Sequence, residues 1–275
     1  MTSNTICIYH GNCMDGFTGA WVVRKALGDT VEFYPGAYQV DPPDLAGRDV
    51  IFVDFSYKRP VMEKILEQAA SVIVLDHHQS AVIDLDGLSF TDSLFDMARS
   101  GAMLAWNFYF PGEEPPEFIK YVQDRDLWQW KLENSKEVSA GMFTYPYEFS
   151  SLDWFAEPEA LSYLKRDGAT VYRKQMKDIE ELIASNKRSM VIGGYTVPVA
   201  NIPYLMASEA CNIMAKDVEF AACYSDTAEG RVFSLRSAET GIDVSEVAKK
   251  YGGGGHFHAS GFKVPIGWEG DSADT

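Results

Sequence analysis

Short polar segments of this sequence carry the residue types that bind divalent metal ions. His10 and Asp15 follow a first apolar run, Asp54 follows a second, and Asp76-His77-His78 directly follows a third. Carboxylates and imidazoles are suitable ligands for hard and borderline divalent cations, and one carboxylate commonly bridges two such ions. Two cations ~3.5–4 Å apart can generate a hydroxide and stabilise charge on a phosphoryl group. The residue types therefore predict a two-metal site for phosphoester hydrolysis.

Taken singly, several of these residues have an ordinary structural interpretation. Asp15-Gly16 could form a turn and a helix cap, Asp54 could cap a loop, and His10 alone is unremarkable. The run at 76–78 is different, because three adjacent polar groups directly after SVIVL are poor material for a hydrophobic core. This run is therefore the most informative of the candidate segments.

The apolar runs before these residues have the length and composition of buried strands. They lie at 5–9 (TICIY), 50–55 (VIFVDF) and 71–75 (SVIVL), and helical patterns at 17–27 and 60–70 alternate with them. Such alternation predicts a parallel α/β sheet, whose ligands bind at the carboxyl ends of the strands. Because each candidate segment follows a strand, we expect these side chains to meet at one edge of the sheet.

The pattern changes after a long helical stretch at 158–186. Further helices are expected before it at 98–109 and 116–128, with an irregular aromatic segment at 143–154. After it come short β segments at 189–192, 196–200, 220–225, 232–236 and 262–264, and helices at 205–215 and 244–251. We expect an α/β protein with an N-terminal parallel-sheet catalytic domain at 1–155 and a helical linker at 156–188. A smaller C-terminal α/β substrate-binding domain at 189–267 and a disordered tail at 268–275 would follow.

Composition limits the classes of function. The formal net charge of −16 argues against a protein that coats long duplex nucleic acid, which needs a broad basic face. The four cysteines form no CxxC pair, and neither a secretory leader nor a membrane span is recognisable. We therefore expect a cytoplasmic protein with no membrane partner. The oligomeric state stays open, a homodimer included.

Four pieces in this order resemble the DHH phosphoesterase superfamily. They are His10 with Asp15-Gly16, Asp54 after an apolar strand, Asp76-His77-His78, and the distant GGGGHFHASGF at 252–262. The chain is most similar to the branch with a DHH-associated C-terminal domain, which includes nanoRNases, RecJ-type exonucleases and cyclic-dinucleotide phosphodiesterases. The resemblance extends from about residue 5 to residue 265.

The resemblance implies a set of metal ligands. They are His10 for the first metal, Asp15, His77 and Asp124 for the second, and Asp54 as the bridge between the two. Asp126 is the alternative to Asp124. Mn²⁺ is the metal that such sites usually prefer, with Mg²⁺ or another divalent cation as the alternative.

The catalytic residues implied by the resemblance are Asp76, which would orient a ligand, and His78, which would face the substrate phosphate. One departure stands out, because the family normally has an aspartate where this chain has Cys13, and the spacing from His10 is one residue shorter. Cys13 could be a soft thiolate ligand or a small packed residue, and we favour the packed interpretation. From chain order, the segment 99–101 (Arg-Ser-Gly) is also expected near the metals.

Substrate binding is expected in the C-terminal part. Glycines let a backbone approach a ligand closely and point N–H groups at phosphate, although a merely flexible loop is the alternative. The resemblance implies contacts from Gly253, Gly254, Gly255 and His256, and from Arg236, whose guanidinium suits a phosphate. Trp128 or Tyr204 could stack on bases, although ordinary packing is the simpler interpretation.

The resulting hypothesis is a two-metal phosphodiesterase that hydrolyses short single-stranded oligonucleotides or dinucleotides to mononucleotides. One alternative is a phosphatase or pyrophosphatase acting on small compounds such as bisphosphate nucleotides. Another is a non-catalytic nucleotide-binding protein whose first metal site has decayed at Cys13.

Overall fold

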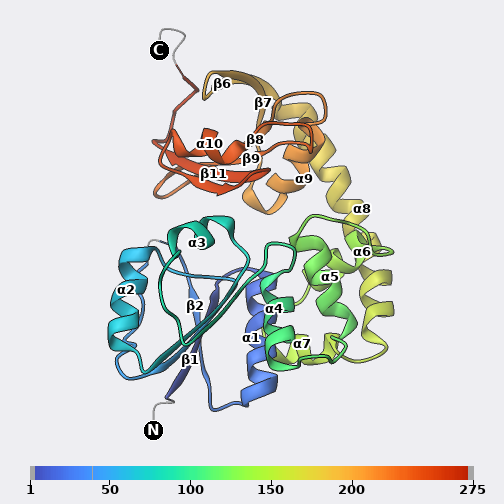
Figure 1. The fold of residues 1–275 in the computed structure, drawn as a ribbon. Helices are drawn as coiled ribbons and strands as arrows, with labels where there is room; N and C mark the ends of the chain where they lie inside the picture. The colour runs from blue at the N-terminus through green and yellow to red at the C-terminus, as the bar shows by residue number, and fades with distance from the viewer. Residues whose placement is uncertain (1–3, 39, 272–275) are drawn as a thin grey trace. The chain divides into compact units, whose positions relative to one another are not determined.

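The computed structural model describes residues 4–38 and 40–271 (Figure 1). The chain divides into two compact units, and the boundary between Tyr172 and Arg173 lies inside one long helix, α8 (Ala160–Asn186). Within the described part, every helix is too short or too polar to cross a membrane. The domain limits expected from the sequence stay predictions.

The first unit is built on a parallel sheet of five strands in the order β2-β1-β3-β4-β5. These strands are β1 (Thr5–His10), β2 (Glu32–Gly36), β3 (Asp49–Val53), β4 (Ser71–Asp76) and β5 (Asp92–Phe95). The predicted strands at 5–9, 50–55 and 71–75 are thus the three central ones. Because all five run in the same direction, their carboxyl ends lie along one edge.

Side chains of the central strands alternate between two cores, as the period of two in a strand requires. Cys7, Ile51 and Leu75 pack in a cluster with α1 (Met14–Leu27) and α4 (Gly101–Tyr109). On the opposite face, residues such as Ile8 and Phe52 pack with α2 (Arg59–Gln68). Figure 1 shows α1 and α4 on one side of the sheet and α2 on the other. Because the central strands are buried on both faces, their sequences are continuous apolar runs and do not alternate between apolar and polar residues.

The remaining helices of this unit are α3 (Gln79–Asp84), α5 (Glu117–Asp126), α6 (Ser135–Met142) and α7 (Phe149–Phe155). α4 and α5 lie within the stretches predicted at 98–109 and 116–128. α7 overlaps the aromatic segment at 143–154 and ends one residue beyond it, and its Leu152 and Phe155 are buried.

The second unit is built on a mixed sheet of six strands in the order β10-β11-β9-β8-β7-β6. The strands are β6 (Arg188–Ile192), β7 (Tyr195–Asn201), β8 (Ala221–Thr227), β9 (Gly230–Arg236), β10 (Gly254–His256) and β11 (Ala259–Val264). Only β7 and β8 pair in parallel within this described sheet. The sheet is accompanied by α9 (Tyr204–Met214) and α10 (Val244–Lys249). The predicted α/β fold class is therefore confirmed.

The segment after residue 267 is packed where the structure describes it. Trp268 lies against the core of the second unit, and the hydroxyl of Tyr251 donates to the carboxylate of Asp271 at 2.8 Å. Glu269 forms ion pairs with Arg188 and Arg231. The expected disorder at 268–275 is thus wrong for 268–271, because an aromatic ring and two carboxylates tie this stretch down. Residues 272–275 lie outside the described residues.

Candidate metal and substrate site

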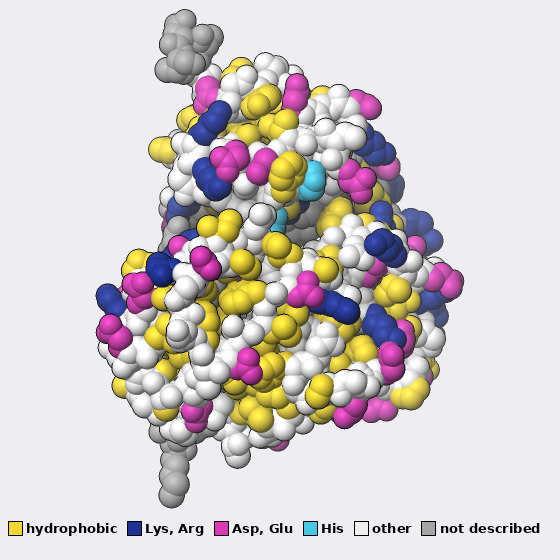
Figure 2. Space-filling view, in the orientation of Figure 1, with side chains coloured by type: hydrophobic (Ala, Val, Ile, Leu, Met, Phe, Trp, Pro, Cys, Tyr) yellow, Lys and Arg dark blue, Asp and Glu magenta, His cyan; other side chains and the backbone are white. Residues whose placement is uncertain are grey.

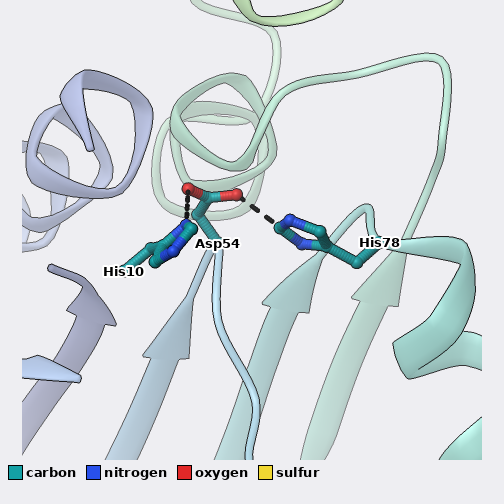
Figure 3. Close-up of side chains that lie close together, drawn as sticks. All are labelled: His10, Asp54 and His78. Atoms are coloured by element: carbon teal, nitrogen blue, oxygen red, sulfur yellow. Dashed lines mark ion pairs between the residues drawn. The ribbon is translucent and has the colours of Figure 1, made fainter. Parts of the chain in front are cut away.

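Three adjacent strands bring their terminal residues together at the carboxyl edge of the first sheet. His10 ends β1, Asp54 follows β3, and Asp76 ends β4. Oδ1 of Asp54 lies 3.1 Å from Nε2 of His77, and Oδ2 of Asp54 lies 3.4 Å from Nδ1 of His10. Nδ1 of His78 is 3.8 Å from Oδ1 of Asp54. Figure 3 shows the carboxylate of Asp54 between the rings of His10 and His78.

Asp54 occupies a backbone conformation that few residues accept. Its φ is +54°, in the left-handed region, where Asp and Asn are tolerated better than most side chains. Its N–H still donates to the carbonyl of Leu75 at 2.9 Å, so the ladder between β3 and β4 extends to this residue. Strained residues of this kind persist where the surrounding structure fixes them, and they cluster at functional sites.

Asp15 is held by the first turn of α4. The backbone N–H groups of Gly101 and Ala102 donate to its two carboxylate oxygens, at 2.6 and 3.1 Å. The side chain of Ser100 caps the same helix. A helix N-terminus favours a carboxylate, because its N–H groups are unsatisfied and its dipole is positive. Gly101, in the 99–101 segment, thus touches a predicted ligand.

The packing around these ligands requires glycine at two positions. A Cβ on Gly101 would lie 2.4 Å from Cβ of Asp54 and 3.0 Å from Oδ2 of Asp15. A Cβ on Gly16 would lie 2.5 Å from the carbonyl oxygen of His10. Both distances to the nearest atoms are far below van der Waals contact, so α1 and α4 approach the ligands this closely only through glycine. The role of Gly101 was not anticipated from the sequence.

Asp76 serves the turn that follows β4. Its fully buried carboxylate accepts hydrogen bonds from the N–H groups of His77 and His78, at 2.8 and 3.1 Å, and from the hydroxyl of Ser56 at 3.2 Å. It also lies 2.6 Å from Nδ1 of His78. A carboxylate bonded to an imidazole nitrogen fixes the orientation of the ring. This geometry matches an orienting role.

The structure places Asp126, and not Asp124, beside the cluster. Oδ2 of Asp126 lies 3.4 Å from Nε2 of His77. The carboxylate of Asp124 instead accepts from the backbone N–H groups of Lys131 and Leu132, at 2.9 and 3.3 Å. The prediction of Asp124 as a ligand therefore does not fit, because its carboxylate is used to hold the loop after α5.

Two groups of potential ligands share Asp54. One comprises His10, Asp54 and His78, and the other Asp15, Asp54 and His77, each with ligand atoms within 4.8 Å of one another. Oδ2 of Asp54 and Oδ2 of Asp126 are buried and lack a hydrogen bond of good geometry in the described part of the chain. Buried carboxylate oxygens of this kind need a partner. The donor set of carboxylates and imidazoles fits two hard or borderline divalent cations.

The electrostatics of the cluster also point to missing positive charge. Burial and the negative charges of Asp126 and Asp54 hold the pKa of Asp15 well above its usual range. Burial and Asp54 raise the pKa of Asp126. Burial opposes ionisation of Asp54, yet its contacts with His10 and His77 hold its pKa below the usual range. Burial would lower the pKa of His77, but Asp54, Asp126 and Asp15 raise it to about 10. Bound cations would compete with protons for these groups and offset the charge of the carboxylates.

Cys13 lies at the cap position of α1, close to these carboxylates. Burial, and then the charges of Asp54, Asp126 and Asp15, hold the pKa of its thiol well above the usual range. The potential ligand groups found among residues 4–38 and 40–271 do not include it. The choice between a thiolate ligand and a packed residue at Cys13 stays a prediction.

In the second unit, Arg236 and His256 lie in one row across three strands. Arg236 of β9 pairs with Ala259 of β11, which pairs with His256 of β10. Residues opposite each other in antiparallel strands face the same side, so two strand spacings, ~10 Å, separate the two backbones. The guanidinium of Arg236 donates to the hydroxyl of Ser208 at 2.7 Å and to the carbonyl of Leu235. Two predicted substrate contacts thus share one face of this sheet, with a small alanine between them.

The glycine run before His256 has a structural explanation at two of its positions. A Cβ on Gly253 would lie 2.1 Å from the carbonyl oxygen of Gly261, and one on Gly255 would lie 2.5 Å from that of Ala259. These glycines let β10 approach β11. A Cβ on Gly254 would meet no atom within 4 Å. Among the three predicted binding glycines, Gly254 therefore has open space beside it.

A pocket of about 520 Å³ lies elsewhere in the first unit, between α4, α5 and the loops that follow them. Its lining includes Arg99, Gln123 and Asp124, and none of the ligands grouped around Asp54. The side chain of Gln123 accepts from the N–H of Ser100 at 3.2 Å. This contact connects the pocket wall to the helix that holds Asp15.

Comparisons with known proteins agree with this architecture. No protein-family model matches the chain. The chain is 27% identical over 281 residues to the uncharacterized protein R106 of Acanthamoeba polyphaga mimivirus, covering 93% of this chain and 66% of the viral protein. It is 25% identical over 294 residues to the oligoribonuclease NrnB of Bacillus subtilis, covering 94% and 72% of the two chains. The chain thus spans just under two-thirds of the viral relative's length.

Solved structures show the same fold at low sequence identity. The DHH domain of a protein described as a member of the s1p family of ribosomal proteins has a TM-score of 0.61 at 14% identity, covering 94% of this chain and 82% of that one. RecJ of Thermus thermophilus in complex with Mn²⁺ has a TM-score of 0.56 at 15% identity, covering 94% and 49%. The pGpG-specific phosphodiesterase PggH of Vibrio cholerae has a TM-score of 0.50 at 15% identity, covering 95% and 94%. The resemblance to the DHH superfamily is therefore confirmed at the level of the fold.

Proposed function

On this DHH fold, we propose that the chain is a two-metal phosphodiesterase that hydrolyses short single-stranded oligonucleotides or dinucleotides to mononucleotides. The observation that carries the proposal is the carboxylate of Asp54. One of its oxygens faces His77 at 3.1 Å and the other faces His10 at 3.4 Å. A carboxylate with a different ligand at each oxygen is suited to bridge two cations.

The two ligand groups would hold the cations. His10, Asp54 and His78 would bind one, and Asp15, Asp54 and His77 would bind the other, with Asp126 next to His77. Two divalent cations at such a site polarise a phosphoryl oxygen and lower the pKa of a water molecule, which allows attack on phosphorus near neutral pH.

The other residues of the first unit prepare the site for that chemistry. Asp76 fixes the imidazole of His78, and α4 holds both oxygens of Asp15 through backbone N–H groups. Positions held this firmly lower the cost of organising the site when the substrate binds. His78, predicted to face the phosphate, lies in the same group as His10 and Asp54, so it could serve as a ligand or contact the phosphate.

Substrate binding is assigned to the row formed by Arg236 and His256 in the second unit. Arg236 offers a charged fork for phosphate, and its contact with Ser208 restricts its orientation. Gly254 has open space beside its Cα, which suits close approach of a ligand to the backbone.

Short nucleotides are the substrate class that the remaining observations favour. Two of the similar proteins are the oligoribonuclease NrnB and the pGpG-specific phosphodiesterase PggH. The net charge of this chain is −16, and Figure 2 shows its basic side chains interspersed with acidic ones on the face drawn. A long duplex needs a broad basic surface, whereas a short nucleotide needs only a local one.

The test is hydrolysis with Mn²⁺ of a ladder of oligonucleotides, beside a bisphosphate nucleotide and pyrophosphate. We expect the shortest oligonucleotides to yield mononucleotides, and Asp54→Asn to abolish turnover without unfolding the protein. Turnover of pyrophosphate or the bisphosphate nucleotide alone would reject the diesterase proposal. Fewer than two Mn²⁺ per chain under saturation, with no turnover, would instead support a nucleotide-binding protein.

A further inference from the structure

The loop after α5 contains two tryptophans in an unusual backbone conformation. Trp128 has φ +55° and Trp130 has φ +53°. A bulky residue in the left-handed region is a genuine outlier, because its Cβ crowds the neighbouring carbonyl. Trp128 closes the C-terminus of α5, because its N–H and that of Gln129 donate to the carbonyl oxygens of Arg125 and Asp124, at 2.9 and 2.8 Å. A left-handed residue is common at this position, where glycine is the usual choice.

Asp124 holds the loop that follows this helix end. Its two carboxylate oxygens accept from the N–H groups of Lys131 and Leu132, and its carbonyl oxygen accepts from the N–H of Gln129 at 2.8 Å. The side chain is only 5% exposed. Hydrogen bonds to a charged, buried acceptor are strong, so one residue fixes the loop from 129 to 132. A loop held this firmly loses little entropy when a ligand binds to it.

The loop carries a partly exposed tryptophan that is close in the chain to a candidate metal ligand. Trp128 is 37% exposed, and its ring packs edge-on against Trp130, with centroids 4.9 Å apart. Trp128 lies two residues after Asp126 in the chain, and Oδ2 of Asp126 is 3.4 Å from Nε2 of His77. Two residues of chain span at most ~7 Å, so Trp128 starts within that distance of a residue in the cluster.

We propose that Trp128 is a stacking platform for one nucleobase of the substrate, held in place by the Asp124-anchored loop. The inference rests on the proposed function and adds to it a residue that selects substrates carrying a base. Every base has a π-face, so stacking supplies affinity without a strict sequence preference. An indole is large and rigid, and it loses little freedom on binding when its backbone is already fixed.

The experiment measures the Kd of a dinucleotide whose phosphodiester is replaced by a non-hydrolysable methylenephosphonate, with Mn²⁺ present, by calorimetry. Binding is compared with that of two analogues, each lacking one of the bases. Stacking of one base contributes about 5- to 150-fold in affinity. We expect Trp128→Ala to weaken binding of the intact ligand by this factor. The same substitution should not weaken binding of the analogue that lacks the stacked base. Trp128→Phe should retain part of the affinity.

Trp128→Gly separates stacking from structural packing. Glycine accepts a positive φ, so this variant relieves strain at residue 128, and we expect its Tm to stay at or above that of the wild type. Its Kd should rise as in Trp128→Ala. Tyr163→Ala is the matched control, because Tyr163 is an aromatic residue of α8 that is 44% exposed, and its loss should leave the Kd unchanged.

Three outcomes would overturn the inference: an unchanged Kd in Trp128→Ala, an equal loss for the intact ligand and for both analogues, or no binding by the wild type. Because the ligand cannot be hydrolysed, the result is independent of turnover. Base-dependent binding by a wild type that does not cleave the natural dinucleotide would support the stacking role and reject the diesterase.

Discussion

Gly101 begins α4 in contact with two carboxylate side chains, and a methyl group at this position would force them apart. In Gly101→Ala the new Cβ would lie 2.4 Å from Cβ of Asp54 and 3.0 Å from Oδ2 of Asp15. Carbon atoms in contact prefer about 3.5–4.0 Å. The start of the helix, or Asp54, must therefore move by roughly 1 Å to relieve the contact.

This displacement acts on the hydrogen bonds to Asp15 from the N–H groups of Gly101 and Ala102, which are 2.6 and 3.1 Å long. Each such bond to a charged group contributes about 1.5–3 kcal/mol, and metal ligands that lose their supporting bonds typically lose 10–100-fold in affinity. Overpacking should also lower the free energy of unfolding by about 1–3 kcal/mol. That loss exceeds the gain of up to about 1 kcal/mol expected when alanine replaces glycine in a helix.

The assay is calorimetric titration of metal-stripped protein with Mn²⁺, together with thermal unfolding. Ala102→Gly is the control, because it removes a Cβ one residue later and keeps the N–H that donates to Asp15. It should lose about 1 kcal/mol of stability without losing metal affinity. If Gly101→Ala were more stable than the wild type and bound Mn²⁺ equally well, the argument that α4 positions Asp15 would be refuted.

Three further outcomes follow from the same geometry. The affinity for Mn²⁺ should rise between pH 7 and 9 and level off above about 10. The reason is that His77, with a pKa of about 10, must lose its proton before it can act as a ligand. A calorimetric affinity that does not change with pH over this range would contradict the prediction. Asp126→Asn should reduce Mn²⁺ affinity at least about tenfold in calorimetric titration. Asp124→Asn should instead lower the free energy of unfolding by about 1–3 kcal/mol in a denaturation experiment, because it weakens the loop that Asp124 holds. If Asp124→Asn lost metal affinity and Asp126→Asn lost stability, Asp124 would be the ligand after all. Ser208→Ala should raise KM several-fold with little change in kcat, since it frees the guanidinium of Arg236, and Ser208→Thr should rescue part of the effect.

The sequence was sufficient to predict the candidate ligands that lie directly after strands. His10, Asp54 and His77 follow apolar runs, and parallel strands necessarily bring such residues to one edge. The choice between Asp124 and Asp126 could not be made in this way. Two residues apart on a helix are about 200° apart around its axis, so only one of them can face the cluster. Which one does depends on how α5 packs, and that is a tertiary property.

Short elements at the edges of the fold also escaped sequence analysis. β2 and β5 are edge strands of five and four residues, and their exposed positions interrupt the apolar pattern. α6 ends where an aromatic segment begins, and small residues such as Ala140 and Gly141 are buried beside its two larger apolar residues, Val138 and Met142. Gly101 looks like any glycine at the start of a helix. Its necessity appears only when Asp15 and Asp54 are seen on either side of it.

The left-handed backbone at Asp54 changes which substitutions there count as conservative. Charge and size alone would make glutamate the mildest replacement, yet its longer chain gives no local hydrogen bond that compensates a positive φ. Asparagine shares with aspartate the tolerance for this conformation. The backbone after β3 thus tolerates asparagine, which removes the negative charge, better than glutamate, which keeps it. Of these three residues, only aspartate satisfies both the backbone conformation and the need for a charged ligand.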